Sequence, residues 1–138
     1  MALEAPEIGY DLVKQLLEQM ELKYVEDQGD VVVPWESLRM YFVFRGEGDQ
    51  RVFSVRSFYE RRYSVEQKPR LLEILDDWNR GTLWPKAYSE TSDDGTVHVV
   101  AESHYLVGVA ISPEAFAHSM VSWVRAGVDF NNWLADQP

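Results

Sequence analysis

The chain has 138 residues and no cysteine, which predicts one ordinary domain and excludes disulfides, thiolate metal sites and a cysteine nucleophile. An apolar fraction of 46% is sufficient for a hydrophobic core. The net charge of −10 opposes binding to nucleic acid or anionic lipid and favours a basic partner.

The first expected element is an amphipathic helix over residues 8–20. Ile8, Leu12 and Leu16 recur at helical spacing, and Glu and Lys occupy the other side. The N-terminus MALEAPEIGYDLVKQL has neither the basic start nor the apolar run of a signal peptide. The chain also lacks any run of about 18 apolar residues, the length needed to span a membrane. We therefore expect a cytoplasmic protein without a membrane segment.

Short apolar runs separated by turn residues follow this helix. LKYVE and VVVP flank the turn sequence DQGD, which is typical of a hairpin. RMYFVFR alternates, with Met40, Phe42 and Phe44 on one face and Tyr41 and Val43 on the other. Residues 51–59 resume the strand pattern after GEGDQ. Together these runs predict a meander of three or four antiparallel strands.

A second helix is expected after Ser64, because Ser64 and Gln67 have capping-box spacing. Gly81 stands where the C-cap of this helix is expected. The apolar stripe of the helix is formed by Leu71, Leu72, Leu75 and Trp78.

Two more strands, residues 85–91 and 96–104, are joined by the hairpin signal SDDG. Ser112 as N-cap and Pro113 at the first helical position then open a long final helix. Gly127 interrupts the apolar stripe of that helix and predicts close backbone packing or a bend. The chain therefore reads as one α+β domain over residues 1–138, an antiparallel sheet with helices packed on it, in the order α-β-β-β(-β)-α-β-β-α.

The stretch DDWNRGTLWPKAY, residues 76–88, could be an active-site loop or a packing joint between helix and strand. Trp78 closes the helical stripe, and Asn79 can hydrogen-bond loop backbone at the helix end. Pro85 biases Trp84 toward an extended conformation that begins the next strand. We interpret the stretch as a packing joint.

Residues 56–70 form the one basic segment, with aromatic residues between the charges. This composition is typical of a platform for single-stranded nucleic acid. The acidic remainder of the chain opposes that function, and a solvated connection from strand to helix explains the segment more simply. An anionic ligand stays open as an alternative, with four candidate residues: Arg56, Arg61, Arg62 and Arg70.

Catalytic constellations are not evident in the sequence. His98, Glu102 and His104 share one face of a strand, but His98 and His104 are separated by about 20 Å on an extended chain, too far for one metal ion. Glu73 and Asp77 lie on the polar side of the second helix. We therefore expect no catalytic residue, metal or cofactor.

The residues around the tryptophan joint carry a family resemblance. DDWNRGTLWPKAY, the acidic hairpin and YLVGVAISPEAFAHSMVSWVRAGVDFNNWL together resemble the YbjN-type bacterial proteins, described as sensory transduction regulators. The resemblance covers nearly the whole chain. It implies a fold shared with type III secretion chaperones, frequent dimers, and neither catalytic residues nor a cofactor.

The leading hypothesis from the sequence is a non-enzymatic protein-binding module, chaperone-like or regulatory, acting as a homodimer. It would hold a peptide segment of a protein partner on exposed aromatic surface or at sheet edges. The alternative is a regulator that binds an anionic ligand or nucleic acid through the basic segment. The candidate contact residues for a protein partner are Trp35, Tyr41, Phe58, Tyr59 and Trp84.

Overall fold

The computed structural model describes residues 7–138, so the first six residues of the N-terminal segment lie outside it. Within this range the elements follow the expected order. The helices are α1 (Tyr10–Gln19), α2 (Lys68–Gly81) and α3 (Pro113–Ala135), with a short 3-10 helix, η1 (Gly48–Gln50). The strands are β1 (Val25–Asp27), β2 (Asp30–Pro34), β3 (Leu38–Arg45), β4 (Val52–Tyr63), β5 (Lys86–Thr91) and β6 (Val97–Leu106).

The strands form one antiparallel sheet in the order β1-β2-β3-β4-β6-β5. The first four strands are the predicted meander, and β5 and β6 return as a hairpin that places β6 beside β4. One row of the ladder runs from Tyr41 to Arg56, then to Glu102 and Lys86. Because facing residues point to the same side, these four side chains share one face of the sheet.

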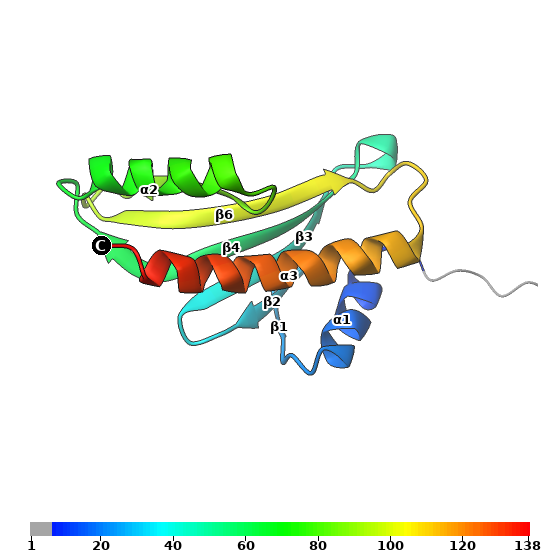
Figure 1. Cartoon of the computed structure of the whole chain (residues 1–138). Helices are drawn as coiled ribbons and strands as arrows, with labels where there is room; N and C mark the ends of the chain where they lie inside the picture. Colours follow the sequence, from blue (N-terminus) through cyan, green and yellow to red (C-terminus); the bar gives the residue numbers. More distant parts are fainter. Residues whose placement is uncertain (1–6) are drawn as a thin grey trace, which may run out of the picture.

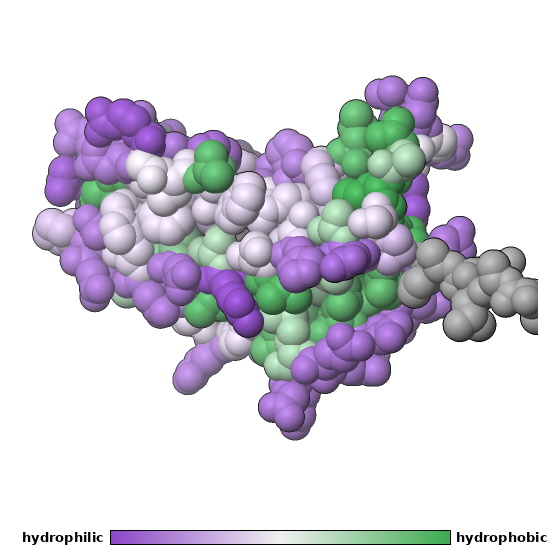
Figure 2. All heavy atoms as spheres, turned by 45° about the vertical axis from the view of Figure 1, so that its right-hand side comes forward, coloured by the Kyte–Doolittle hydropathy of each residue, from purple (hydrophilic) through white to green (hydrophobic). Residues whose placement is uncertain are grey.

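All three helices pack on the other face. The core contains Met40, Phe42 and Phe53, each 0% exposed, together with apolar residues of α1, α2 and α3. Figure 1 shows α3 crossing in front of the strands, α2 along β6, and α1 beside the β1–β2 side. Figure 2 shows hydrophobic atoms below the level of α3, on the side of α1, where the two helices meet over the sheet.

The opposite face, which we call the open face, carries no helix within residues 7–138. Val32, Val43 and Val100 point to it and are only 2%, 7% and 0% exposed, although none belongs to the core cluster. Larger side chains on the same face therefore cover them. Tyr41 and Phe58 are the half-buried aromatic residues of this face, and their rings meet edge to face at 5.3 Å.

The joint between α2 and β5 is confirmed as a packing element. Trp78 Nε1 donates to the Pro85 carbonyl oxygen at 2.9 Å. The Asn79 amide donates to the Ala87 carbonyl and accepts from the Ala87 N–H, each at 2.9 Å. The side chain of Asn79 thus replaces a neighbouring strand at the outer edge of β5.

Two of the expected caps and the expected close approach are also present, whereas the C-cap predicted at Gly81 is wrong, because α2 includes Gly81 and its C-cap is Thr82. Ser64 and Gln67 exchange side-chain and backbone hydrogen bonds ahead of α2, and Ser112 Oγ accepts from Ala115 N–H at the start of α3. At Gly127 an added Cβ would lie 2.6 Å from Met40 Cε, so α3 sits against the sheet at this residue.

Two further sequence predictions are wrong in detail. Strand β4 continues to Tyr63 rather than ending near Tyr59, with a register shift between Phe58 and Arg62, so the basic segment begins inside the sheet. In α2, Leu72 is 47% exposed and Ile74 takes its place in the core. The helix presents positions 71, 74, 75 and 78 to the sheet, and position 72 falls outside that stripe.

Within residues 7–138, no helix combines the length and the apolar character that a membrane crossing requires.

Candidate functional site

The open face contains two adjacent hollows that share Arg39 and Phe58. The first, which we call the arginine hollow, has a volume of about 390 Å³ and is lined by Arg39, Arg45 and Arg56 around Tyr41 and Val43. The second, the tryptophan hollow, has a similar volume of about 390 Å³. Its walls include Trp35, Arg39, Phe58, Arg62 and His98.

A polar network fixes the middle of the open face. Arg56 Nε donates to Glu102 Oε1 at 2.6 Å, and Tyr88 Oη donates to the same oxygen at 2.9 Å. The Arg56 guanidinium also lies 5.6 Å from the centroid of the Phe58 ring. These contacts cross β4, β6 and β5 and hold Arg56 in one position.

A second network holds the end of the arginine hollow. Arg45 binds Asp30 with two hydrogen bonds of 3.0 and 2.9 Å, and Tyr10 Oη donates to Asp30 Oδ1 at 2.8 Å. Tyr10 Oη in turn accepts from Phe44 N–H at 3.0 Å. Burial opposes ionisation of Asp30, but the hydrogen bonds from Arg45 and Tyr10 outweigh it and lower the pKa of this carboxyl.

The tryptophan hollow differs from the arginine hollow because Arg39 and Arg62 have no ion-pair partner in the part of the chain that the structure describes. Arg39 faces Phe58 across the ladder and Arg62 faces His98. Within residues 7–138, neither guanidinium makes an ion pair or a side-chain hydrogen bond. Nearby, the pKa of Asp94 is lowered first by the N–H of Thr96, with smaller contributions from His98 and Arg62. The hollow therefore has unused donors beside aromatic walls.

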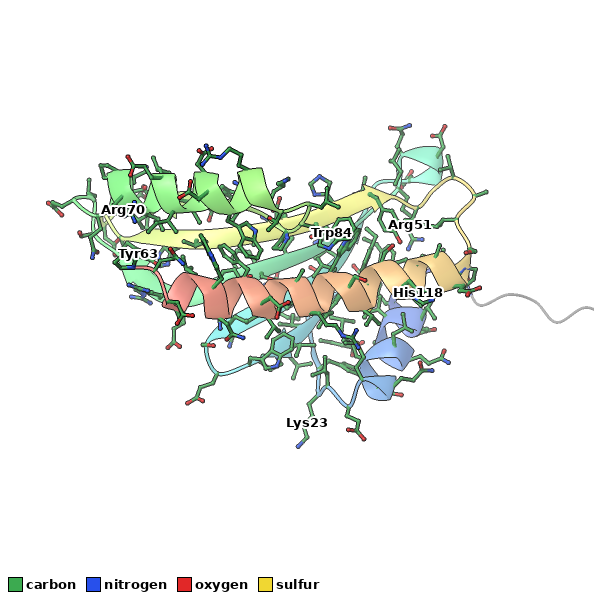
Figure 3. All side chains as sticks on the ribbon, in the orientation of Figure 1. Lys23, Arg51, Tyr63, Arg70, Trp84 and His118 are labelled. Atoms are coloured by element: carbon green, nitrogen blue, oxygen red, sulfur yellow. The ribbon has the colours of Figure 1, made fainter. Side chains whose placement is uncertain are left out.

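The five candidate contact residues are not brought together on one surface. Trp35, Tyr41 and Phe58 line the two hollows, and Tyr59 borders the tryptophan hollow from the core side. Tyr59 is 4% exposed, and its hydroxyl donates to the Gly127 carbonyl oxygen at 3.0 Å on the core side. Trp84 is 42% exposed, but its ring lies 6.3 Å from Trp123 of α3, on the side of the helices. Figure 3 shows Trp84 between the start of β5 and α3.

The four candidate anion-binding arginines are also dispersed. Arg56 pairs with Glu102 on the open face, and Arg70 pairs with Glu73 on α2, at the end away from Trp84 in Figure 3. Arg61 donates to the Leu134 carbonyl at the end of α3. Of these four candidates, only Arg62 lines the tryptophan hollow.

Metal ligands do not converge within residues 7–138, where no group of three or more His, Asp and Glu side chains could hold an ion. On β6, His104 is exposed and His98 is half-buried, and both lie on the open face.

Sequence reasoning missed Arg39 and Arg45, although a signal was present. In RMYFVFR the residues alternate between faces, so Arg39 and Arg45 share the side of Tyr41 and Val43. The alternation that identified the core face also identifies the arginines of the open face. His98 was considered only as a metal ligand, and its place beside Arg62 depends on the pairing of β4 with β6.

The sequence of residues 10–136 matches one family model, YbjN, described as "Putative bacterial sensory transduction regulator". The chain belongs to the YbjN family. The predicted membership and the predicted α+β fold are therefore confirmed. The YbjN description is that of a regulator rather than an enzyme.

A solved structure has the same architecture. The chain is similar to the crystal structure of YbjN from E. coli, described as "a putative transcription regulator", with a TM-score of 0.67 and 18% sequence identity. The similarity covers 97% of this chain and 96% of that one. At 18% identity this similarity is evidence for the fold and not for a function. No curated protein sequence is significantly similar to the chain.

Proposed function

We propose that the chain is a non-enzymatic, cytoplasmic protein-binding module and that its contact surface is the open face. The observation that carries this proposal is the one-sided cover of the sheet. All three helices and the core lie on one face, while Tyr41, Phe58 and the arginines occupy the other. A regulator can act through such a surface by binding alone.

The dimensions of the open face fit a protein partner. Six strands spaced about 4.8 Å apart span about 24 Å, and a strand of eight residues is about 27 Å long. The resulting area of roughly 600 Å² approaches the roughly 800 Å² that each partner contributes to a standard interface. Its residues are also of a suitable kind, because aromatic side chains and arginine are enriched in interfaces.

The sheet edges support binding at the face rather than by strand addition. At the outer edge of β5, Asn79 already occupies the backbone groups of Ala87, and Lys68 Nζ donates to Thr91 Oγ1. At the other edge, β1 has only 3 residues. Short and covered edges offer little backbone to an added strand.

The alternative, an anionic ligand or nucleic acid bound through the basic segment, stays a prediction. Its support is weak because Arg56, Arg61 and Arg70 each have a separate acceptor in different parts of the molecule. The homodimer implied by the family resemblance also stays a prediction, for which sedimentation should give twice the chain mass of 16.0 kDa.

The test is capture of partners from host lysate with three forms of the tagged protein. Tyr41→Glu places a charge on the open face, and Leu72→Glu makes the same kind of change on α2, where Leu72 is 47% exposed. We expect a stoichiometric protein, resistant to nuclease, to be recovered with wild type and Leu72→Glu. Recovery should fall about tenfold with Tyr41→Glu, because this variant removes an aromatic ring from the middle of the contact surface, and such rings carry much of the binding free energy of an interface. Equal recovery with both variants would contradict the proposal, and circular dichroism checks that both fold.

A further inference from the structure

The arginines of the chain are not equivalent. Most of them have an acceptor of their own: Arg45, Arg51, Arg56, Arg61, Arg70 and Arg80. Within residues 7–138 the exceptions are Arg39, Arg62 and Arg125. Two of these three line the tryptophan hollow, whereas Arg125 lies in a separate hollow between α1 and α3.

The two free arginines reach the tryptophan hollow from neighbouring strands. Arg39 comes from β3 opposite Phe58, and Arg62 comes from β4 after the register shift, opposite His98. Trp35 follows β2 and packs with its inner side against the core, so its ring is held in place. The hollow thus offers guanidinium donors beside the Trp35 and Phe58 rings.

This combination favours a carboxylate that has an apolar neighbour. A guanidinium presents donors in a planar fork that matches the two oxygens of a carboxylate. The aromatic rings supply surface for an adjacent apolar side chain, which contributes through burial. An Asp or Glu beside an apolar residue in a peptide has both features.

The carboxylates of the hollow disfavour a polyanion. Glu36 and Glu60 also line it, and both are exposed. A single carboxylate brings one negative charge to these two groups, whereas a phosphate backbone would bring several. The net charge of −10 adds a long-range repulsion that acts on each phosphate.

We propose that the tryptophan hollow, through Arg39 and Arg62, binds the carboxylate of an acidic side chain with an apolar neighbour in a partner peptide. This inference rests on the proposed function and specifies the partner chemistry at the same face. The expected basic client of an acidic protein would leave Arg39 and Arg62 without an acceptor, whereas a partner carboxylate supplies one.

The experiment uses the full chain, labelled with nitrogen-15, and two short peptides with blocked termini that differ only in a central Glu or Gln between leucines. The Trp35 indole N–H and the arginine Nε–H signals are followed during titration. We expect the Glu peptide to shift these signals with an affinity roughly tenfold above that of the Gln peptide, because the hydrogen bond is charge-assisted.

Two double variants distinguish an effect of the hollow on peptide binding from an effect of the net charge of the protein. Arg39→Gln with Arg62→Gln should abolish the preference for Glu, while Arg70→Gln with Arg80→Gln, on α2, removes the same charge and should leave it unchanged. Equal binding of both peptides, no shift at all, or tighter binding of an oligothymidylate would overturn the inference. So would self-association, seen by sedimentation, that disappears with the Arg39–Arg62 variant, because the occupant would then be a second copy.

Failure of the carboxylate inference can be distinguished from failure of the proposed function. A captured partner that is lost with Tyr41→Glu but retained by the Arg39–Arg62 variant would leave the open face as the contact surface. It would at the same time contradict the assignment of a carboxylate to the tryptophan hollow.

Discussion

Gly127 is the residue at which α3 comes closest to the sheet. An added Cβ would lie 2.6 Å from Met40 Cε and 3.3 Å from Ser57 Oγ, and Met40 is 0% exposed, so its terminal methyl group would have to shift within the packed core. We predict that Gly127→Ala lowers the free energy of unfolding by about 1–3 kcal/mol despite the better helix propensity of alanine. Urea denaturation measures this change.

Gly81→Ala is the matched control, because nothing lies within 4 Å of a Cβ at this last residue of α2. It should leave stability unchanged or raise it by up to about 1 kcal/mol. Equal losses at Gly81 and Gly127 would mean that close packing is not the reason for glycine in α3.

Asp30 makes a second prediction at the scale of one residue. Its carboxylate accepts two hydrogen bonds from Arg45 and one from Tyr10, and its pKa is lowered in the folded protein. Asp30→Asn should therefore cost about 1.5–3 kcal/mol at neutral pH, the usual value of hydrogen bonds to a charged group.

The pH dependence of this cost has a defined sign. Because the folded pKa lies below the unfolded value of about 3.9, the contribution of Asp30 is complete above that pH and is lost as the pH falls through the folded pKa. Urea unfolding at several pH values should show the difference between wild type and Asp30→Asn shrinking below about pH 4. A difference that stays constant into acid would contradict this account, and Asp27→Asn, at an exposed neighbouring position, is the control.

At the scale of elements, α2 and β5 are joined through one side chain. Asn79 makes two hydrogen bonds to the backbone of Ala87, each 2.9 Å long. We predict that Asn79→Ala destabilises the protein by about 1–3 kcal/mol and accelerates hydrogen exchange of the Ala87 amide, which loses its acceptor.

Asn132→Ala on the exposed side of α3 is the comparison for Asn79. Unchanged exchange at Ala87 in the Asn79 variant would show that the edge of β5 does not depend on this residue.

Sequence patterns predicted those features that depend on interactions between residues close in the sequence. The capping box at Ser64, the N-cap at Ser112 and the joint at Asn79 each involve residues close in the sequence. The alternation of Met40, Phe42 and Phe44 likewise identified the core face of β3. Such local signals do not depend on which strands become neighbours.

The candidate site was predicted less completely because it depends on pairing between distant strands. Tyr59 looked available, but the register of β4 points it into the core under α3. Arg62 meets His98 only because β6 inserts beside β4 after a register shift. The position of Trp84 on the side of the helices likewise follows from the packing of the joint against α3.

For the whole molecule, the two sides of the sheet have different roles. The side with the helices contains the core, whereas the open face combines buried valines, aromatic rings and arginines. Charge is also unevenly distributed, since the arginine hollow places three arginines against two aspartates in a chain of net charge −10. This contrast is the basis for placing the partner on the open face.

Hydroxyl-radical footprinting of the protein, alone and with its captured partner, tests this claim most directly because it reports the solvent access of individual side chains. We predict that the partner protects Trp35, Tyr41 and Phe58 on the open face and leaves Leu83 and Trp84 as reactive as in the free protein. Leu83 and Trp84 are 76% and 42% exposed, so a partner bound on the side of the helices would be detected. Protection of Leu83 and Trp84, with Tyr41 and Phe58 unchanged, would contradict the account.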